Sequence, residues 1–252
     1  MDGTRDLSHF VQAYEGTPPW DIGRPQPAFV RLFDAGAIVG AVLDAGCGTG
    51  EHALLATARG HAAVGVDVVP AAIERARAKA GDRDRGLAPD FVVADALRLE
   101  ALGRTFDTVL DCGLFHVFSD ADRARYVASL ARALRDGGRA FVLCFSEREP
   151  GDWGPRRVTE RELRDAFRDG WEVERVVPER LETNLGPQGV HAWLAVVRRA
   201  AQRSRVASPG YEGPEGVSRV QANVADPSNA RLEDWNDNWQ WSPVVEAWAS
   251  SR

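Results

Sequence analysis

The chain has 252 residues, of which 44% are hydrophobic and 27% are charged, and its formal net charge at pH 7 is -6. These values predict a folded domain with a sizeable core and exclude disorder over most of the length. The acidic balance gives no electrostatic reason to expect nucleic acid or an anionic membrane surface as a partner. Lys79 is the only lysine, which we attribute to coding bias rather than to a site.

The N-terminus and the cysteines bear on the cell compartment. The first residues, MDGTRDLSHF, lack the cationic and then apolar stretches of a signal peptide, and no apolar run reaches membrane-spanning length. Cys47, Cys112 and Cys144 form no CxxC pair, and no Cys/His cluster has zinc-like spacing. We therefore expect a cytoplasmic protein with reduced thiols, no membrane partner and no metal site.

Short apolar strands alternate with helical patterns between residues 41 and 199. Strands are predicted at 41–46, 63–68, 91–96, 106–113, 139–146, 171–177 and 191–199, and helices at 51–60, 70–81, 120–135 and 159–167, with a turn at GPQG, 186–189. This alternation implies a mostly parallel sheet that is covered on both faces. Such sheets bind ligands beyond the carboxyl ends of their strands, so the residues just after each strand form the candidate site.

The composition of the sequence changes after residue 199. Residues 200–217 are polar and rich in Gly and Pro, which predicts a linker. Residues 218–252 contain Trp235, Trp239, Trp241 and Trp248. We expect a domain at 1–199, a linker at 200–217 and a tryptophan-rich C-terminal extension at 218–252.

The stretch LDAGCGTGEHA, residues 43–53, places Gly46, Gly48 and Gly50 directly after a strand. Such glycines allow a sharp turn and expose backbone N–H groups to a ligand at a helix N-terminus, although a tight turn without a ligand is an alternative. NAD is another alternative, but its fingerprint is GxGxxG, whereas the spacing here is GxGxG. The carboxylate of Glu51 would repel a pyrophosphate, but not a ligand with an amino group or a sulfonium. The pattern therefore favours S-adenosylmethionine over NAD.

Two aspartates follow the next two strands. Asp67 ends the second strand at the distance where a carboxylate meets a ribose hydroxyl pair. Asp95 ends the third strand, where a carboxylate can accept a hydrogen bond from an adenine amino group. Each could alone be an ordinary loop or capping aspartate. Together with the glycine loop they mark three successive strand ends, which favours a nucleoside-containing ligand.

The stretches LDAGCGTGEHA, VGVDVVPAAIERAR, VVADAL, FDTVLDCGLFHVFSD and LRDGGRAFVLCFSE together resemble the class I S-adenosylmethionine-dependent methyltransferases, over about residues 40–198. The resemblance implies an α/β fold with a doubly wound, mostly parallel seven-stranded sheet, Rossmann-like, that ends in an antiparallel hairpin. It implies that the cofactor is S-adenosylmethionine. The implied cofactor residues are Asp44, Gly46, Gly48 and Gly50 for the methionine moiety, Asp67 for the ribose, Asp95 and Ala96 for the adenine, and Cys112 for the amino-acid group.

The segment YEGTPPWDIGRPQP, residues 14–27, is similar to the entry segment of thiopurine- and thiol-methyltransferase-like members of that family. Those members act on thiols and on hydroxylated heteroaromatic molecules, which implies a small-molecule methyl acceptor. The similarity places Trp20 over the cofactor and Arg24 near its carboxylate or near the acceptor. Trp20 could instead be a buried anchor for an N-terminal helix.

Methyl transfer from a sulfonium is an in-line displacement, so positioning of the acceptor does much of the catalysis. A phenol or N-hydroxyl gains from a general base, whereas an ionised thiol needs little help. His116, just beyond the fourth strand, is the candidate base, although it could equally be structural. Asp21 and Asp111 are weaker candidates, and we expect Asp21, Phe115 and Phe118 to line an aromatic acceptor pocket.

The tail ADPSNARLEDWNDNWQWSPVVEAW, residues 225–248, has a weak resemblance of its own. It is similar to the C-terminal regions of ribosomally made scaffold peptides, to which ligases append amino acids in natural-product pathways. The alternative is a helix that docks its tryptophans on the catalytic domain or on a second subunit. The tail is thus expected to contact a partner enzyme or to form a homodimer.

Overall fold

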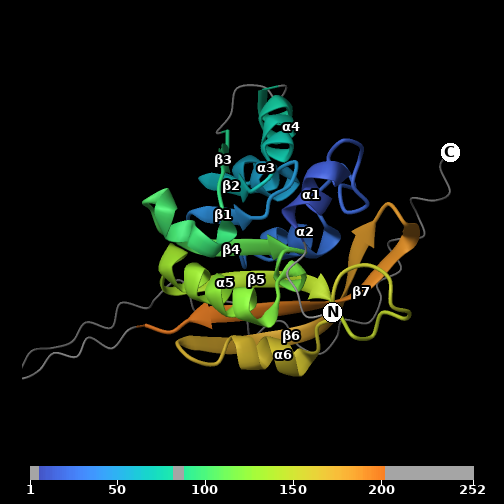
Figure 1. Cartoon of the computed structure of the whole chain (residues 1–252). Helices are drawn as coiled ribbons and strands as arrows, with labels where there is room; N and C mark the ends of the chain where they lie inside the picture. The colour runs from blue at the N-terminus through green and yellow to red at the C-terminus, as the bar shows by residue number, and fades with distance from the viewer. Residues whose placement is uncertain (1–5, 82–87, 202–252) are drawn as a thin grey trace, which may run out of the picture. The chain divides into compact units, whose positions relative to one another are not determined.

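The computed structural model of the protein describes residues 6–81 and 88–201 (Figure 1). Its elements in chain order are α1 (Leu7–Ala13), α2 (Pro27–Asp34), β1 (Val42–Ala45), α3 (Glu51–Ala58), β2 (Ala63–Asp67), α4 (Pro70–Gly81), β3 (Asp90–Val93), η1 (Ala96–Leu102), β4 (Phe106–Cys112), η2 (Phe115–Val117), α5 (Asp120–Ala133), β5 (Leu134–Phe145), α6 (Glu160–Ala166), β6 (Trp171–Thr183) and β7 (Gly186–Arg199). The predictions for the linker beyond residue 201 and for the C-terminal extension fall outside the described residues. No helix in the described ranges is long and apolar enough to cross a membrane.

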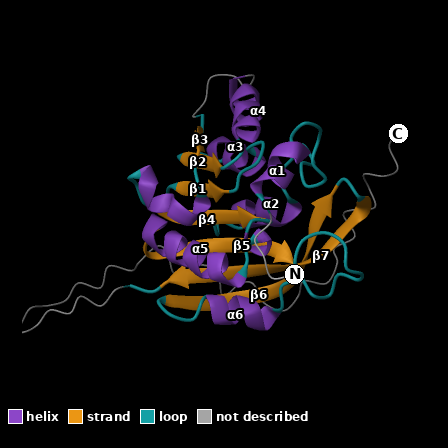
Figure 2. Cartoon of the chain, in the orientation of Figure 1, coloured by secondary structure: helices purple, strands orange, loops and turns teal. Residues whose placement is uncertain are grey.

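The seven strands form one sheet in the order β3-β2-β1-β4-β5-β7-β6, which can be followed from top to bottom in Figure 2. Strands β1 to β5 pair in parallel, whereas β7 is antiparallel to both of its neighbours. The chain runs outward from β1 to β3 and then returns to the other side of β1 at β4. The order of the strands therefore reverses between β1 and β4, which is where a doubly wound sheet binds its ligand. The predicted fold class is confirmed.

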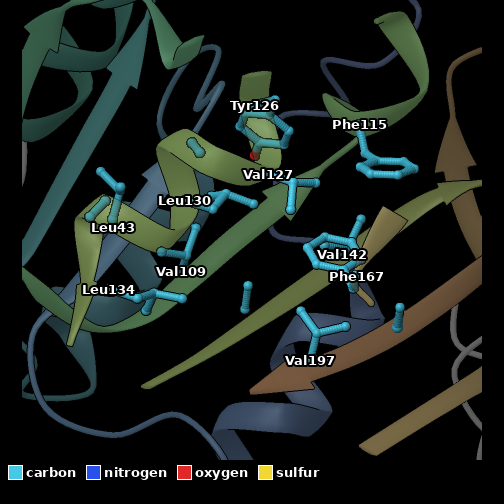
Figure 3. Close-up of a cluster of buried hydrophobic side chains, with 14 of the residues drawn as sticks. Leu43, Val109, Phe115, Tyr126, Val127, Leu130, Leu134, Val142, Phe167 and Val197 are labelled. Atoms are coloured by element: carbon cyan, nitrogen blue, oxygen red, sulfur yellow. The ribbon is translucent and has the colours of Figure 1, made fainter. Parts of the chain in front are cut away.

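Strand β1 shows how the two faces of the sheet are covered. Leu43 and Ala45 point into a cluster of buried side chains that also contains Tyr126 and Leu130 of α5 (Figure 3). Asp44, between them, points the other way, because its carboxylate accepts a hydrogen bond from the backbone N–H of Ala53 in α3 at 3.0 Å. Successive strand residues alternate between faces, so α5 and α3 lie on opposite sides of the sheet.

Helix α5 forms where its apolar stripe predicts a helix, but it ends earlier. The Ser119 side chain caps its first turn by accepting a hydrogen bond from the backbone of Asp122 at 3.1 Å. Helix α5 ends at Ala133, and Leu134 already has extended backbone angles and begins β5. Strand β5 therefore starts before the predicted residue 139. It contains Gly137, with φ 79°, beside a register shift against β4.

The last two strands are much longer than predicted, at 13 residues for β6 and 14 for β7. Thr183 pairs with Gly186, so the turn lies at Asn184 and Leu185, and the predicted GPQG turn is part of β7. Between Ala192 and the turn, β6 and β7 pair only with each other, because the pairing of β7 with β5 ends at Ala192. Few residues of this part of the hairpin are buried, Leu181 and Val190 among them, so its apolar pattern is weak and these parts of the two strands were not predicted.

Helices α1 and α2 precede the sheet and were not assigned from the sequence. Pro27 opens α2 at its first turn, and Phe29, Leu32 and Phe33 bury its apolar face. In α1 the side chain of Asp6 accepts a hydrogen bond from Ser8 at the helix start. The chain from α1 to α2 passes over the carboxyl ends of the strands, where it completes the site described next.

Candidate active site

A cavity of about 550 Å³ opens beyond the carboxyl ends of the parallel strands. Its walls also include the N-terminal segment, the loop after β5 and the tip of the β6–β7 hairpin. The predicted site residues that line it are Trp20, Asp21, Arg24, Gly46, Gly48, Asp67, Asp95, Ala96, Cys112, His116 and Phe118. Four others, Asp44, Gly50, Asp111 and Phe115, do not line it.

The glycine loop after β1 makes one wall of the cavity. Gly48 has φ 53°, and a Cβ added there would lie 2.8 Å from the hydroxyl oxygen of Tyr14. Gly50 has φ 87° and caps α3, where a Cβ would lie 2.5 Å from the ring of Phe91. Gly48 thus keeps the backbone bare toward the cavity, whereas Gly50 permits the loop to pack on β3. The cofactor contact predicted for Gly50 is replaced by a packing role.

Asp67 fixes the glycine loop from the end of β2. Its two carboxylate oxygens accept hydrogen bonds from the backbone N–H groups of Gly48 and Val69, both at 2.9 Å. Each oxygen retains a further lone pair, so the carboxylate can still accept from a ribose hydroxyl pair. Burial raises the pKa of Asp67 from its ordinary value of 3.8. Asp95 lies at the cavity edge and also caps η1, where it accepts from Leu97 at 2.9 Å.

Two buried carboxylates lie beneath the loop. Burial raises the pKa of Asp44 and of Asp111 from 3.8 to about 7 in each case. Asp111 is held by the Tyr126 hydroxyl at 2.9 Å and by the backbone of Leu114 at 2.9 Å, and it is fully buried, so a base role is closed to it. One oxygen of Asp44, Oδ1, is buried without a hydrogen-bond partner among the described residues.

The three carboxylates of Asp44, Asp67 and Asp111 distinguish between the two candidate ligands, S-adenosylmethionine and a dinucleotide. The negative charges of Asp67 and Asp111 add to the burial that raises the pKa of Asp44. A ligand that brings a cationic amino group and a sulfonium would stabilise the ionised carboxylates. A pyrophosphate would add negative charge to the cluster. The residues present therefore fit S-adenosylmethionine and not a dinucleotide.

Lys79 supports the site from outside the cavity, which corrects its attribution to coding bias alone. Its ammonium donates to Glu51 and to the hydroxyl of Thr49, both at 2.7 Å, and lies 4.0 Å from Asp21. Thr49 in turn donates to Asp21 at 3.0 Å. The carboxylate of Glu51 is thus neutralised from α4, and Asp21 is bound to the glycine loop. No local pattern could reveal this, because Lys79 and Glu51 are 28 residues apart.

The N-terminal segment is held over the cavity from a second side. Asn184, in the hairpin turn, donates its backbone N–H to Pro19 at 2.8 Å and its side-chain amide to Asp21 at 2.7 Å. Arg24 lines the cavity and forms an ion pair with Glu182 of the hairpin at 2.5 Å, and its predicted contact with the cofactor carboxylate or the acceptor stays a prediction. The indole N–H of Trp20 donates to the Tyr14 hydroxyl at 3.3 Å.

His116 lines the cavity, and its protonation pattern follows from one hydrogen bond. Its Nδ1 accepts from the backbone N–H of Phe145 at 3.0 Å. Because a neutral imidazole has one lone pair on nitrogen and one N–H, the neutral ring carries its proton on Nε2. A Cβ added to the cavity-lining Gly113 would lie 3.6 Å from this Nε2. In the neutral ring Nε2 of His116 is therefore a hydrogen-bond donor, which argues against the predicted role as a general base.

The two predicted aromatic residues after β4 separate in the fold. Phe118 lines the cavity and packs against Tyr126 with ring centroids 4.9 Å apart. Phe115 is fully buried and belongs, with Phe167, to the buried cluster in Figure 3. Its ring is stacked on Phe167 with centroids 5.7 Å apart, and the guanidinium of Arg123 lies over it at 4.6 Å. The predicted pocket role of Phe115 is corrected to a core role, because η2 turns successive side chains to different sides.

His52 also lines the cavity, although the sequence did not predict it as a site residue. Its Nε2 accepts from the backbone N–H of Gln26 at 3.1 Å, and burial lowers its pKa to about 4. The neutral ring then carries its proton on Nδ1, which lies 4.0 Å from Asp44. His52 thus connects the N-terminal segment to the carboxylate under the loop. In the described residues no group of three or more His, Cys, Asp or Glu is arranged to hold a metal ion.

The comparisons with known proteins agree with this geometry. The family described as "Methyltransferase domain" matches residues 42–138, which include the glycine loop, Asp67, Asp95 and His116. A protein of Mycobacteroides abscessus named 2-heptyl-1-hydroxyquinolin-4(1H)-one methyltransferase is 40% identical over 170 residues, which are 66% of this chain and 74% of that protein.

Two solved structures are similar over most of the described chain. One, from work on the conversion of a disulfide bond into a thioacetal group during echinomycin biosynthesis, has a TM-score of 0.71 and 40% identity, and the match covers 77% of this chain and 93% of that one. The other is the 1,6-didemethyltoxoflavin-N1-methyltransferase of Burkholderia thailandensis, with 1,6-didemethyltoxoflavin and S-adenosylhomocysteine bound. It has a TM-score of 0.61 and 25% identity, with 77% of this chain and 86% of that chain covered.

Proposed function

Because this chain belongs to the class I S-adenosylmethionine-dependent methyltransferases, we propose that it methylates a hydroxyl or thiol group on a small aromatic molecule. The observation that carries this choice of acceptor is the aromatic wall of the cavity, which Trp20, Phe118, Phe145 and Trp153 form. Flat aromatic molecules pack well against such walls. The Mycobacteroides abscessus relative is named for a hydroxyquinolinone, a molecule of this kind.

The cofactor supplies an electrophilic methyl group on a sulfonium. In this proposal the bare backbone at Gly46 and Gly48 faces its methionine moiety, Asp67 accepts from its ribose, and Asp95 with Ala96 borders its adenine. These residues follow β1, β2 and β3, on one side of the point where the strand order reverses. The acceptor then occupies the other side, near the ends of β4 and β5. The two ligands meet above the switch point, which suits an in-line displacement.

His116 acts in this proposal as a hydrogen-bond donor through Nε2 and not as a general base. The bond from the Phe145 backbone to Nδ1 supports this assignment. A donor stabilises an acceptor that is already an anion and directs its lone pair toward the methyl group. The acceptor must then ionise readily by itself, as a thiol or an acidic N-hydroxyl does near neutral pH.

Labelled methyl transfer tests the proposed function. The full-length protein is incubated with methyl-labelled S-adenosylmethionine and, in separate reactions, with a 1-hydroxyquinolin-4-one, an arenethiol and an aniline. We expect label on the first two acceptors and little on the aniline, whose neutral nitrogen gains nothing from a donor. Transfer to the aniline alone, or to none of the hydroxyl and thiol acceptors, would contradict the proposal.

We infer a cytoplasmic location from the sequence, and an interaction of residues 218–252 with a partner enzyme or with a second copy of the chain. Truncation after residue 201 tests the second point. Light scattering should then show fewer subunits per particle if the tail forms a homodimer, and an unchanged number of subunits would exclude that homodimer.

A further inference from the structure

Exposed apolar side chains gather around the mouth of the cavity. Among the described residues eight large hydrophobic side chains are exposed, and five of them line the cavity: Leu7, Trp20, Val68, Trp153 and Leu185. The exposed fractions reach 41% for Trp153 and 62% for Leu185. Single exposed apolar residues are ordinary, but a group of them around one opening marks a binding surface.

Two of these residues are held next to each other by the hairpin contact. Asn184 binds the backbone carbonyls of Pro19 and Asp21, which flank Trp20 in the sequence. Leu185 follows Asn184 directly, so the same bonds keep Leu185 near Trp20. Both residues are therefore fixed parts of the mouth.

Trp153 is connected to the proposed reaction centre by aromatic contacts. The rings of His116 and Phe145 lie 5.1 Å apart, and those of Phe145 and Trp153 lie 5.9 Å apart. Gly154 allows the loop after β5 to approach this closely, since a Cβ there would lie 3.2 Å from the Phe145 ring. Arg157 fixes the loop by donating to the carbonyl of Trp153 at 2.5 Å. An apolar wall thus runs from His116 to the outside.

We propose that Trp20, Trp153 and Leu185, the apolar rim, bind an alkyl or similarly apolar extension of the methyl acceptor. This inference rests on the proposed function, because it places the reactive head of the acceptor at His116. The continuity of the wall from His116 through Phe145 to Trp153 carries the assignment. A short polar acceptor would leave these side chains in water, whereas an apolar chain that leaves the cavity along the wall covers them.

A homologous series of acceptors tests the rim. We measure kcat/KM for 1-hydroxyquinolin-4-ones that carry methyl, propyl, pentyl or heptyl groups at the 2-position, with the full-length protein. Each methylene that enters the rim should raise kcat/KM about fourfold. Trp153→Ala and Leu185→Ser should lower the ratio of heptyl to methyl kcat/KM by about fifteenfold, the equivalent of two methylenes. Val39→Ser, which changes an exposed side chain outside the cavity, should keep the wild-type ratio.

Calorimetry measures the affinity of the same series for the enzyme saturated with S-adenosylhomocysteine. It tests binding at the rim without turnover. A wild-type affinity that does not change with chain length would overturn the proposal, even if the methyl compound is methylated. Chain-length dependence that persists unchanged in both rim variants would overturn it as well, because the chain would bind elsewhere. Chain-length-dependent binding without methylation would support the rim and contradict the proposed function.

Discussion

At His116 a single backbone hydrogen bond decides what the side chain can offer to a substrate. The Phe145 N–H occupies the Nδ1 lone pair, and the remaining N–H is a donor at the cavity wall. Methyl transfer to an ionised oxygen or sulfur needs the nucleophile to be oriented more than it needs a base. In the proposed reaction the N–H of His116 supplies that orientation.

His116→Ala is therefore expected to reduce kcat/KM by about 10- to 100-fold, the effect of losing one hydrogen bond to a charged group. The reduction should be similar for a hydroxyl acceptor and a thiol acceptor, because both lose the same donor. Initial rates with both acceptors at pH 6 to 9 check this. A loss of about 10²- to 10⁴-fold confined to the hydroxyl acceptor would instead indicate a general base.

Gly50→Ala is expected to lower the free energy of unfolding by about 2–5 kcal/mol. The new Cβ would meet the Phe91 ring at 2.5 Å, which adds overpacking to the cost of φ 87° for an L-residue. Gly60→Ala is the matched control, since its φ is 85° and nothing lies within 4 Å of its added Cβ. Urea denaturation followed by circular dichroism measures both. Equal losses of unfolding free energy in the two variants would show that backbone strain alone, without the Phe91 contact, accounts for the cost of Gly50→Ala.

Three elements that are far apart in the sequence meet around Lys79. Its ammonium, at the end of α4, binds the start of α3 through Glu51 and approaches Asp21 of the N-terminal segment. Asp21 is bound from the opposite side by the hairpin turn through Asn184. The N-terminal wall of the cavity thus depends on α4 and on the β6–β7 hairpin together.

Lys79→Met should loosen this wall. It leaves the largely buried carboxylates of Glu51 and Asp21 without their cation, at a cost between the roughly 1 kcal/mol of exposed pairs and the roughly 3–5 kcal/mol of buried ones. We expect faster amide hydrogen exchange in residues 7–24, with α5 unchanged, and a higher Kd for S-adenosylmethionine. Lys79→Arg keeps the charge and should restore most of the protection. Wild-type amide exchange rates in residues 7–24 of Lys79→Met would show that Lys79 does not hold the N-terminal wall.

Across the whole molecule, buried acids and a buried histidine couple the fold to pH in opposite directions. The folded pKa of Asp44 and of Asp111, about 7, exceeds the ordinary value of 3.8. Their contribution to stability is full below pH 3.8 and is lost as the pH rises through 7. His52 has its pKa lowered to about 4, so its contribution is present above its ordinary pKa of 6.5 and is lost as the pH falls toward 4.

Binding of S-adenosylmethionine should therefore release protons near neutral pH. The positive charge of the cofactor, bound above the glycine loop that covers Asp44, lowers the pKa of that carboxyl, so the affinity should rise between pH 6 and pH 8. Calorimetry in buffers of different ionisation enthalpy measures the protons released. Asp44→Asn should reduce that number, whereas Asp34→Asn, at the exposed end of α2, should not. An observed enthalpy that is independent of the buffer would show that Asp44 does not change protonation on binding.

The amino-acid sequence by itself determined the sheet type and the place of the site. Apolar periodicity and glycine stops are local properties, so the parallel strands and most helices between 41 and 167 could be predicted, and with them the edge of the sheet that binds ligand. The GxGxG loop and the two aspartates that end the next strands then indicated the cofactor. These features depend on residues that are close in the sequence.

Only the tertiary structure decided which side chains of each motif face the cavity and which partners they have. Gly48 and Phe118 line it, whereas Gly50 and Phe115 pack inside the domain. Arg24 is paired with Glu182 across the molecule, a contact that no local pattern encodes. The physical reason is that pairing of distant charges, donors and rings is set by how the elements pack, and the sequence pattern specifies the elements but not these pairs.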